Sequence, residues 1–351
     1  MDDRYVMGIE IGGTNVSVVV GNEKGLLEGS KVREDVNYRS DSYFSAQVFR
    51  MTSEAINRVH LREQDIETYG VGAAGQPTQD GRIVGAANCP FEQTFPRLFG
   101  KKMIVRNDVA VAAYAARKIG YGYTMFENQK SPRYDAAMVR GTGLNMQVLM
   151  DGELIRSWDG KTSEFGHIDL NGEGASLDCF CGANGCAETY ISGSGIARRA
   201  ALRMGNTGYF DYAILKAMRK DFPGKNDSEL IHILSSGQGA RYVTDLADLG
   251  NPEVDMEIAV PVMEESSRNL VRYFGNIINA MPFLPYIEVY GGVAEHHRHY
   301  VDSAVEILKN DKSIRRNYKF DKIPFIGIIN VRNLGLEGTV FMALHELKKE
   351  K

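Results

Sequence analysis

The sequence has no apolar run that approaches the ~20 residues needed for a membrane-spanning helix. Its N-terminus, MDDRYVMG, also lacks the basic and apolar regions of a signal peptide. Cysteine is scarce, with 4 residues in a chain of 351, which argues against a disulfide scaffold and suits a reducing compartment. We therefore expect a cytoplasmic protein that does not act on a membrane.

An excess of basic charge is missing as well. The chain has 41 Lys and Arg residues against 45 Asp and Glu residues, for a net charge of -4. This balance disfavours nucleic acid or an anionic membrane surface as the main partner. At 351 residues the chain is longer than one hydrophobic core usually supports, so we expect two domains.

The cysteines are concentrated in one place. Cys179, Cys181 and Cys186 fall within eight consecutive residues, and His167 lies twelve positions before the first of them. One His and three Cys form a complete tetrahedral ligand set for zinc, with no position left open for water or substrate. The C-x-C spacing is tighter than that of most zinc fingers, so three reduced thiols in a loop are the alternative. The fourth cysteine, Cys89, is expected to be a buried small apolar residue.

Two carboxylates flank this cluster. Glu164 lies three residues before His167, and Glu188 lies two residues after Cys186. A metal ion held by the cluster would therefore fix the positions of both carboxylates together.

The stretch from Glu164 to Glu188 closely resembles the zinc signature of the ROK family of sugar kinases and sugar-responsive repressors. It carries the pattern E-F-G-H followed by C-F-C-G-A-N-G-C-A-E. The resemblance implies that His167 and the three cysteines bind a structural zinc. It also implies that Glu164 and Glu188 hold sugar hydroxyls, with His167 beside the sugar. Weaker matches extend the resemblance from about Gly8 to about Gly292.

Near the N-terminus, two apolar strands are joined by a turn of Gly12, Gly13 and Thr14. Such a turn can cradle a phosphate, although an isolated Gly-Gly-Thr is more often an ordinary hairpin. The resemblance implies the first phosphate loop of an actin-like ATPase. This chain departs from the family with Glu10 in place of Asp and Asn15 in place of Lys.

A second strand, turn and strand over residues 135–155 repeats the N-terminal layout. The resemblance implies that Gly141, Thr142 and Gly143 form a second phosphate loop. The family usually continues with further glycines where this chain has Asn145 and Met146. Gly291 and Gly292 lie between an apolar strand and a helix, and they match the loop on the adenosine side of the nucleotide. We expect the three nearby histidines, His296, His297 and His299, to be solvated.

The pair Asn107 and Asp108 follows a short apolar strand and precedes an alanine-rich helix. Either residue can simply cap that helix. The resemblance implies that Asp108 is the base that accepts the proton of a sugar hydroxyl, and that Asn107 orients the sugar. Gly75 and Asn88 match two further loops that line the sugar pocket in the family.

The fold that follows is a two-lobed α/β fold of the actin-like ATPase (ribonuclease H-like) class, with a cleft between the lobes and a structural zinc loop. We expect a small lobe over residues 1–120, completed by the C-terminal helix 336–351. The larger lobe is expected over residues 121–335, with the zinc loop at 164–188. Residues 121–134 are expected to form a surface loop or the crossing between lobes.

The expected function is ATP-dependent phosphorylation of a hexose or N-acetylhexosamine, at the 6-hydroxyl, with Mg²⁺ and a structural Zn²⁺. A sugar-responsive repressor is the first alternative. Only seven residues precede Gly8, which leaves no room for the helix-turn-helix of such repressors. A sugar-binding protein without catalysis is the second alternative, and the departures at Glu10, Asn15 and Asn145 motivate it. The resemblance also implies a homodimer. The sequence does not identify the sugar.

Overall fold

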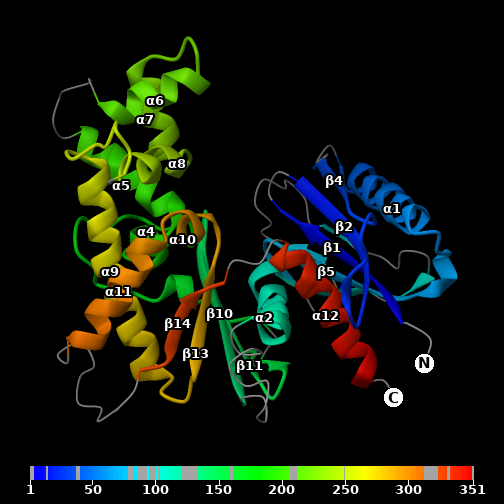
Figure 1. Cartoon of the computed structure of the whole chain (residues 1–351). Coiled ribbons are helices and arrows are strands. Elements are labelled where there is room, and N and C mark those ends of the chain that lie inside the picture. Colours follow the sequence, from blue (N-terminus) through cyan, green and yellow to red (C-terminus); the bar gives the residue numbers. More distant parts are fainter. Residues whose placement is uncertain are drawn as a thin grey trace. The chain divides into compact units, whose positions relative to one another are not determined.

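The fold is that of a computed structural model, which describes residues 4–12, 15–36, 40–77, 82–84, 93–94, 100–101, 103–120, 133–158, 161–205, 212–248, 250–311, 323–329 and 333–349. The chain forms two compact units. The first contains residues 1–137, 147–163 and 331–351, and the second contains residues 138–146 and 164–330. Figure 1 shows the elements of both units in the colours of the sequence.

A mixed sheet forms the centre of the first unit. Its order is β3-β2-β1-β5-β9, and β4 also pairs with β2. Strand β1 is antiparallel to β2 and parallel to β5, and β5 is parallel to β9. The strands are β1 (Tyr5–Ile11), β2 (Asn15–Asn22), β3 (Gly25–Leu26), β4 (Val32–Asp35), β5 (Ile66–Ala73) and β9 (Met103–Asn107). This confirms the predicted N-terminal hairpin and the strand that leads into Asp108.

Helices cover both faces of this sheet (Figure 1). Successive residues of a strand point to opposite faces. Met7 and Ile9 pack in the core with helix α1 (Asp41–Arg58). Gly8, between them, faces helix α12 (Leu334–Lys349), where a side chain on Gly8 would meet Thr339 at 2.2 Å. The C-terminal helix therefore lies directly on the strand backbone.

A small second sheet of the first unit has the order β6-β7-β8. Its strands are β6 (Gln76–Pro77), β7 (Arg82–Val84) and β8 (Gln93–Thr94). They belong to the segment in which the sequence predicts sugar-pocket loops. Helix α2 (Asp108–Ile119) begins where β9 ends, and it packs against α12.

The third sheet repeats the order of the first. It runs β12-β11-β10-β13-β14. In both sheets, three strands that are consecutive in the chain lie side by side in reverse order, and two later strands follow them. The strands are β10 (Tyr134–Arg140), β11 (Leu144–Met150), β12 (Glu153–Leu154), β13 (Tyr286–Tyr290) and β14 (Phe325–Ile328). The chain passes between the units within β10 and β11. The repeated order confirms the internal duplication predicted from the sequence.

The rest of the second unit is mainly helical. Helices α5 to α8 gather at one end of it, away from β13 and β14 (Figure 1). The helices are α4 (Glu188–Ile191), α5 (Gly193–Gly205), α6 (Ala213–Asp221), α7 (Asp227–Ser235), α8 (Ala240–Leu246), α9 (Ala259–Ala280), α10 (Gly292–His296) and α11 (Arg298–Asn310). Among the described helices, none is both long and apolar enough to cross a membrane.

Candidate functional site

The second unit brings His167 and three cysteines into one cluster. The ligand atoms of His167, Cys179, Cys181 and Cys186 all lie within 4.8 Å of one another. The Nδ1 of His167 is 3.5 Å from Cys179 Sγ, and the Sγ atoms of Cys181 and Cys186 are 3.6 Å apart. Tetrahedral zinc, with bonds of about 2.3 Å to sulfur and 2.0–2.1 Å to nitrogen, places its ligand atoms about 3.6–3.8 Å apart. The cluster therefore has the donor set and the dimensions of a structural zinc site.

Backbone pairing builds this cluster from two short segments. Asp169 pairs with Cys186 in an antiparallel bridge, and Ala187 N–H donates to Ile168 O at 2.8 Å. A second bridge joins Asp178 to Asn184, and between them Gly182 turns the chain with a φ of 90°. Most residues from 173 to 184 are exposed, so this loop has little apolar core of its own. A metal ion is the physical means by which such a loop holds one conformation.

Burial opposes the ionisation of two of the three thiols. Burial raises the pKa of Cys186 to about 12, and it also raises the pKa of Cys179. Hydrogen bonds, first that from the backbone of Ala183, lower the pKa of the exposed Cys181. A divalent cation among the three sulfurs would favour the thiolates that burial disfavours.

The two flanking carboxylates, Glu164 and Glu188, lie next to the segments that carry the ligands of this cluster. Glu164 Oε2 is 4.0 Å from His167 Nε2, the ring nitrogen opposite the one that faces the cysteines. Glu188 is the first residue of α4, and its Oε2 accepts a hydrogen bond of 3.0 Å from Leu144 N–H. A carboxylate that hydrogen-bonds the distal nitrogen of a metal-binding His orients such a ligand, and Glu164 lies near that nitrogen at a distance longer than a hydrogen bond.

The sequence predicts that Asn145 replaces a family glycine in the second phosphate loop. In the structure its side chain points to Glu164. It is buried, and its Nδ2 donates to Glu164 Oε2 at 3.1 Å. Sequence reasoning missed this contact, because nothing in the local pattern relates two polar residues that are 19 positions apart.

In the first unit, Asn107 and Asp108 lie at the junction of β9 and α2. The Asn107 side chain caps the helix by accepting from Val109 N–H at 3.0 Å, as the capping interpretation predicted. Its Nδ2 donates to the carbonyl of Gly75 at 3.0 Å, so two predicted sugar-pocket residues lie together. Asp108 Oδ1 also accepts from Val109 N–H, at 2.9 Å.

Burial also affects the ionisation of Asp108. Burial raises the pKa of its carboxyl above the ordinary value of 3.8, although the hydrogen bond from Val109 opposes that change. Raising a carboxyl pKa toward neutrality improves the carboxylate as a proton acceptor. The side chain nevertheless remains partly exposed.

Glu10, the first departure from the family pattern, lies near Asp108. Burial and the Asp108 charge raise the pKa of Glu10. Its carboxylate lies against Gly335 at the start of α12, where an added Cβ would be 2.0 Å from Glu10 Oε1. The longer side chain is thus accommodated by a residue that has no side chain.

Two of the predicted nucleotide turns, both in the second unit, lie together. Gly291 has a φ of 103°, and a Cβ on it would be 2.9 Å from the carbonyl carbon and oxygen of Arg140, just before the turn of Gly141–Gly143. The start of α5 completes this arrangement: Gly193 N–H donates to Gly141 O at 2.7 Å, and Ser194 N–H donates to Thr142 O at 2.9 Å.

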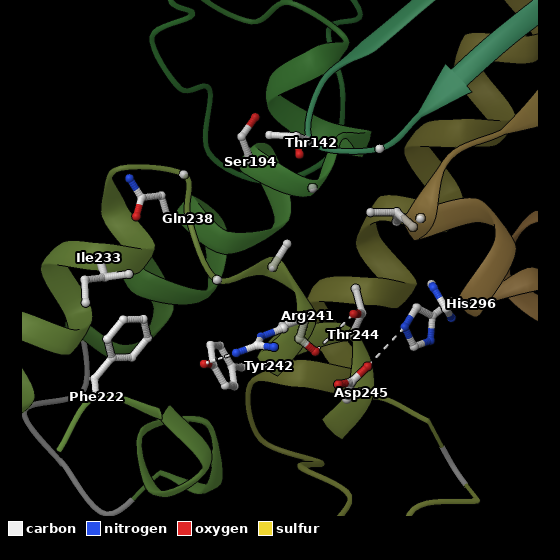
Figure 2. A pocket seen from close by; sticks show the side chains of 18 residues that line it. Thr142, Ser194, Phe222, Ile233, Gln238, Arg241, Tyr242, Thr244, Asp245 and His296 are labelled. Atoms are coloured by element: carbon white, nitrogen blue, oxygen red, sulfur yellow. Dashed lines mark hydrogen bonds and ion pairs between the residues drawn. The ribbon is translucent and has the colours of Figure 1, made fainter. Parts of the chain in front are cut away.

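A cavity of about 520 Å³ opens beside these turns (Figure 2). Its volume lies within the range of small-molecule sites. One part is lined by Gly141, Thr142, Gly292, Val293, His296 and His297, and the remaining wall comes from α5 to α8 and their connections. The lining residues that sequence reasoning missed include Ser194, Phe222, Ile233, Gln238, Arg241, Tyr242 and Asp245. The sequence gives little sign of these residues, because they are spread along helices whose apolar periodicity indicates only packing against a hydrophobic core.

The prediction that His296, His297 and His299 are all solvated is wrong for His297. Helix α10 ends at His296 and α11 begins at Arg298, so the break turns His297 inward. Its side chain is buried in the cavity wall, with Nε2 3.6 Å from Asp245 Oδ1. Burial lowers the pKa of His297, and the Asp245 charge opposes that change.

Three predicted site residues, Gly13, Thr14 and Asn88, lie outside the described residues, as does Cys89. Of the predicted first phosphate loop, Gly12 is described, and its N–H donates to Asn15 O at 2.9 Å.

Comparison with known proteins gives a family. The model of the ROK family matches residues 6–316. A glucokinase from Streptomyces coelicolor is 29% identical over 208 residues, which cover 57% of this chain and 60% of that protein. An N-acetylmannosamine kinase from Vibrio cholerae is 24% identical over 202 residues, covering 55% of this chain and 64% of that protein. The chain therefore matches less than two thirds of the length of these relatives.

Solved structures agree over nearly the whole chain. The ROK hexokinase from Thermus thermophilus has a TM-score of 0.70 and 20% identity, covering 98% of this chain and 99% of that one. A ROK family glucokinase from Streptomyces griseus, in complex with glucose and AMPPNP, has a TM-score of 0.68 and 21% identity, covering 97% of this chain and 99% of that one. These likenesses confirm the predicted two-lobed, actin-like α/β fold. With the family match over residues 6–316 and a His and three-Cys cluster of zinc-site dimensions, the chain belongs to the ROK family.

Proposed function

We propose that this protein is an ATP-dependent sugar kinase that phosphorylates a hexose or an N-acetylhexosamine. One observation carries the proposal. Gly141 and Thr142 line a cavity of small-molecule size, and Leu144 and Asn145, which follow in the chain, contact the carboxylates of Glu188 and Glu164. The segment 141–145 thus adjoins both a pocket for the phosphoryl donor and two carboxylates that can bind sugar hydroxyls. This arrangement suits phosphoryl transfer to an alcohol.

The cavity suits the nucleoside part of a phosphoryl donor. Its wall carries the apolar and aromatic side chains of Phe222, Ile233 and Tyr242, which can contact a flat base. The two glycine turns offer backbone N–H groups without side chains to obstruct a phosphate. Gly12, Gly13 and Thr14 are proposed as the phosphate loop of the first unit, and Mg²⁺ would neutralise charge on the phosphates.

In this proposal Asp108 accepts the proton of the attacking hydroxyl, and Asn107 and Gly75 help to orient the sugar. Asn88 is proposed as a further sugar contact. Glu164, Glu188 and His167 bind the sugar on the second unit. When bound, zinc supplies no chemistry to the reaction. It is proposed to hold His167 and the loop so that Glu164 and Glu188 keep their positions.

The substrate class rests on the relatives. The Streptomyces coelicolor protein is a glucokinase, and the Vibrio cholerae protein is an N-acetylmannosamine kinase. We infer a neutral hexose or N-acetylhexosamine, because Glu164 and Glu188 would repel an anionic sugar. The 6-hydroxyl is proposed as the acceptor from the family resemblance. A homodimer is proposed from the family.

A coupled assay tests this function directly. The purified protein is incubated with ATP, Mg²⁺ and a panel of glucose, mannose, allose, N-acetylglucosamine and N-acetylmannosamine, and ADP release is followed. At least one sugar is expected to give magnesium-dependent turnover. Calorimetry with each sugar and with a non-hydrolysable ATP analogue provides the binding control. If sugars bind but no nucleotide binds and no product forms, the function is that of a sugar sensor.

The sensor remains the second candidate because of Glu10, whose carboxylate lies against Gly335. Hydrated Mg²⁺ keeps several of its waters and tolerates indirect contact with a carboxylate. Glu10→Asp is therefore expected to change kcat by less than about 10-fold, well below the effect of losing a general base. Steady-state kinetics with saturating sugar and varied Mg²⁺ measure this. A variant that gains activity while the parent has none would favour the sensor.

A further inference from the structure

Strand β11 contacts the two proposed sugar carboxylates in different ways. Glu188 Oε2 accepts from the backbone N–H of Leu144, a donor that almost any residue at that position would supply. Glu164 Oε2 instead accepts from the side chain of Asn145, at 3.1 Å. The position of Glu164 therefore depends on which amino acid occupies position 145.

Asn145 is well placed for this role. It is only 8% exposed, and its Oδ1 accepts from Phe165 N–H at 2.9 Å and from Met146 N–H at 2.8 Å. One carboxamide thus contacts the carboxylate of Glu164 and the backbone of the next residue. Because both ends of the amide are used, its orientation is fixed.

A second carboxamide supports the same segment. Gln147 follows Asn145 by two residues, so both side chains lie on one face of β11. Gln147 is fully buried, and its Nε2 donates to Ser163 O at 2.6 Å. The segment from Ser163 to Phe165 is therefore held by two side chains, of which Asn145 also hydrogen-bonds the Glu164 carboxylate.

We propose that Asn145 is a positioning residue for sugar recognition, which aims the Glu164 carboxylate at one hydroxyl of a neutral pyranose. A carboxylate offers about four lone-pair sites, so a bond from Asn145 leaves acceptor capacity for a sugar hydroxyl. A glycine at this position, as in the family pattern that the sequence resembles, has no side chain to make the contact. The inference rests on the proposed sugar site, and it assigns to position 145 a part in choosing the sugar.

The test is Asn145→Asp. This change keeps the side chain's shape and its acceptor for Phe165 N–H, and it replaces the donor that faces Glu164 with a carboxylate oxygen that repels it. Sugar affinity is expected to fall about 10- to 100-fold, as for loss of a hydrogen bond to a charged group. Affinity for the ATP analogue and zinc content should stay at parental values. Gln147→Met is the matched control, because it removes the neighbouring carboxamide without touching Glu164, and its effect on sugar affinity should be smaller.

A panel of monodeoxy sugars separates positioning from general damage. Calorimetry is run for the parent, Asn145→Asp, Glu164→Gln and the double variant. The loss caused by Asn145→Asp should vanish for the one deoxy sugar that lacks the hydroxyl read by Glu164, and the two substitutions should not be additive. A uniform loss across the panel, or parental affinity in Asn145→Asp, would overturn the proposal.

Binding rather than turnover is measured, so the outcome is separate from that of the kinase proposal. If the parent binds sugars without phosphorylating them, the proposed kinase fails while the role of Asn145 can still be confirmed. If the parent binds no sugar of the panel, the role of Asn145 fails as well.

Discussion

Asp108→Asn is expected to lower kcat by about 10²- to 10⁴-fold, the usual contribution of a general base. The amide keeps the size of the carboxylate and its ability to contact a hydroxyl, so sugar affinity should change little. The loss should appear in kcat rather than in KM. Steady-state kinetics, with sugar binding measured by calorimetry, check both statements. Turnover near the parental rate would rule Asp108 out as the base.

The same substitution should not destabilise the protein at neutral pH. Burial raises the pKa of Asp108 in the folded state above its ordinary value of 3.8, so folding favours the protonated carboxyl. The parent therefore loses stability as the pH rises from about 3.8 through the folded-state pKa, and an amide avoids that loss. Urea unfolding of both proteins at pH 4 and pH 7.5 measures this. The free energy of unfolding of the variant, relative to that of the parent, should be higher at pH 7.5 than at pH 4.

A matched control comes from helix α1. Asp41 is its first residue, as Asp108 is the first residue of α2. Asp41→Asn makes the same chemical change at the same helical position, and it should leave kcat unchanged. If both variants lost activity to a similar extent, the loss would come from removing a charge at the start of a helix, and it would not identify Asp108 as a base.

Loss of the metal is expected to have the second large effect. Purified protein should contain about one zinc per chain, and Cys181→Ser should release it. Structural zinc contributes about 10–16 kcal/mol of apparent binding free energy in zinc-finger peptides. If even about 3 kcal/mol is lost here, the Tm of a domain of 150–250 residues falls by roughly 6–12 °C. Sugar affinity should fall about 10-fold or more, because Glu164 and Glu188 lose the support of the loop.

Cys181 suits this test because it is exposed, so serine leaves no cavity in the core. Ala175→Ser, an exposed change in the same loop that removes no side-chain hydrogen bond, should alter neither zinc content nor Tm. Elemental analysis, thermal unfolding and sugar calorimetry are compared for the three proteins. Carefully handled parent protein without zinc, or a Cys181→Ser variant with parental sugar affinity, would contradict the proposed role of the cluster.

The metal cluster shows how far sequence reasoning can reach. Three cysteines within eight residues and one nearby His already define a ligand set, because the donors of a turn-rich loop must meet if the chain folds back once. The structure brings all four ligand atoms within 4.8 Å of one another, as that pattern predicted. The duplicated strand order was visible for a similar reason, since strands and turns leave short, regular signals.

The sequence by itself determined the family, the α/β class and the His and three-Cys cluster, and it supplied Asp108 as the proposed base, because each is encoded within short stretches of chain. Only the tertiary structure decided that Asn145 contacts Glu164, that His297 is buried against Asp245, and that α5 to α8 wall a cavity beside two glycine turns. These contacts join residues far apart in sequence or depend on where one helix breaks. Local propensity carries no information about such pairs, since packing of the whole unit sets which distant side chains meet.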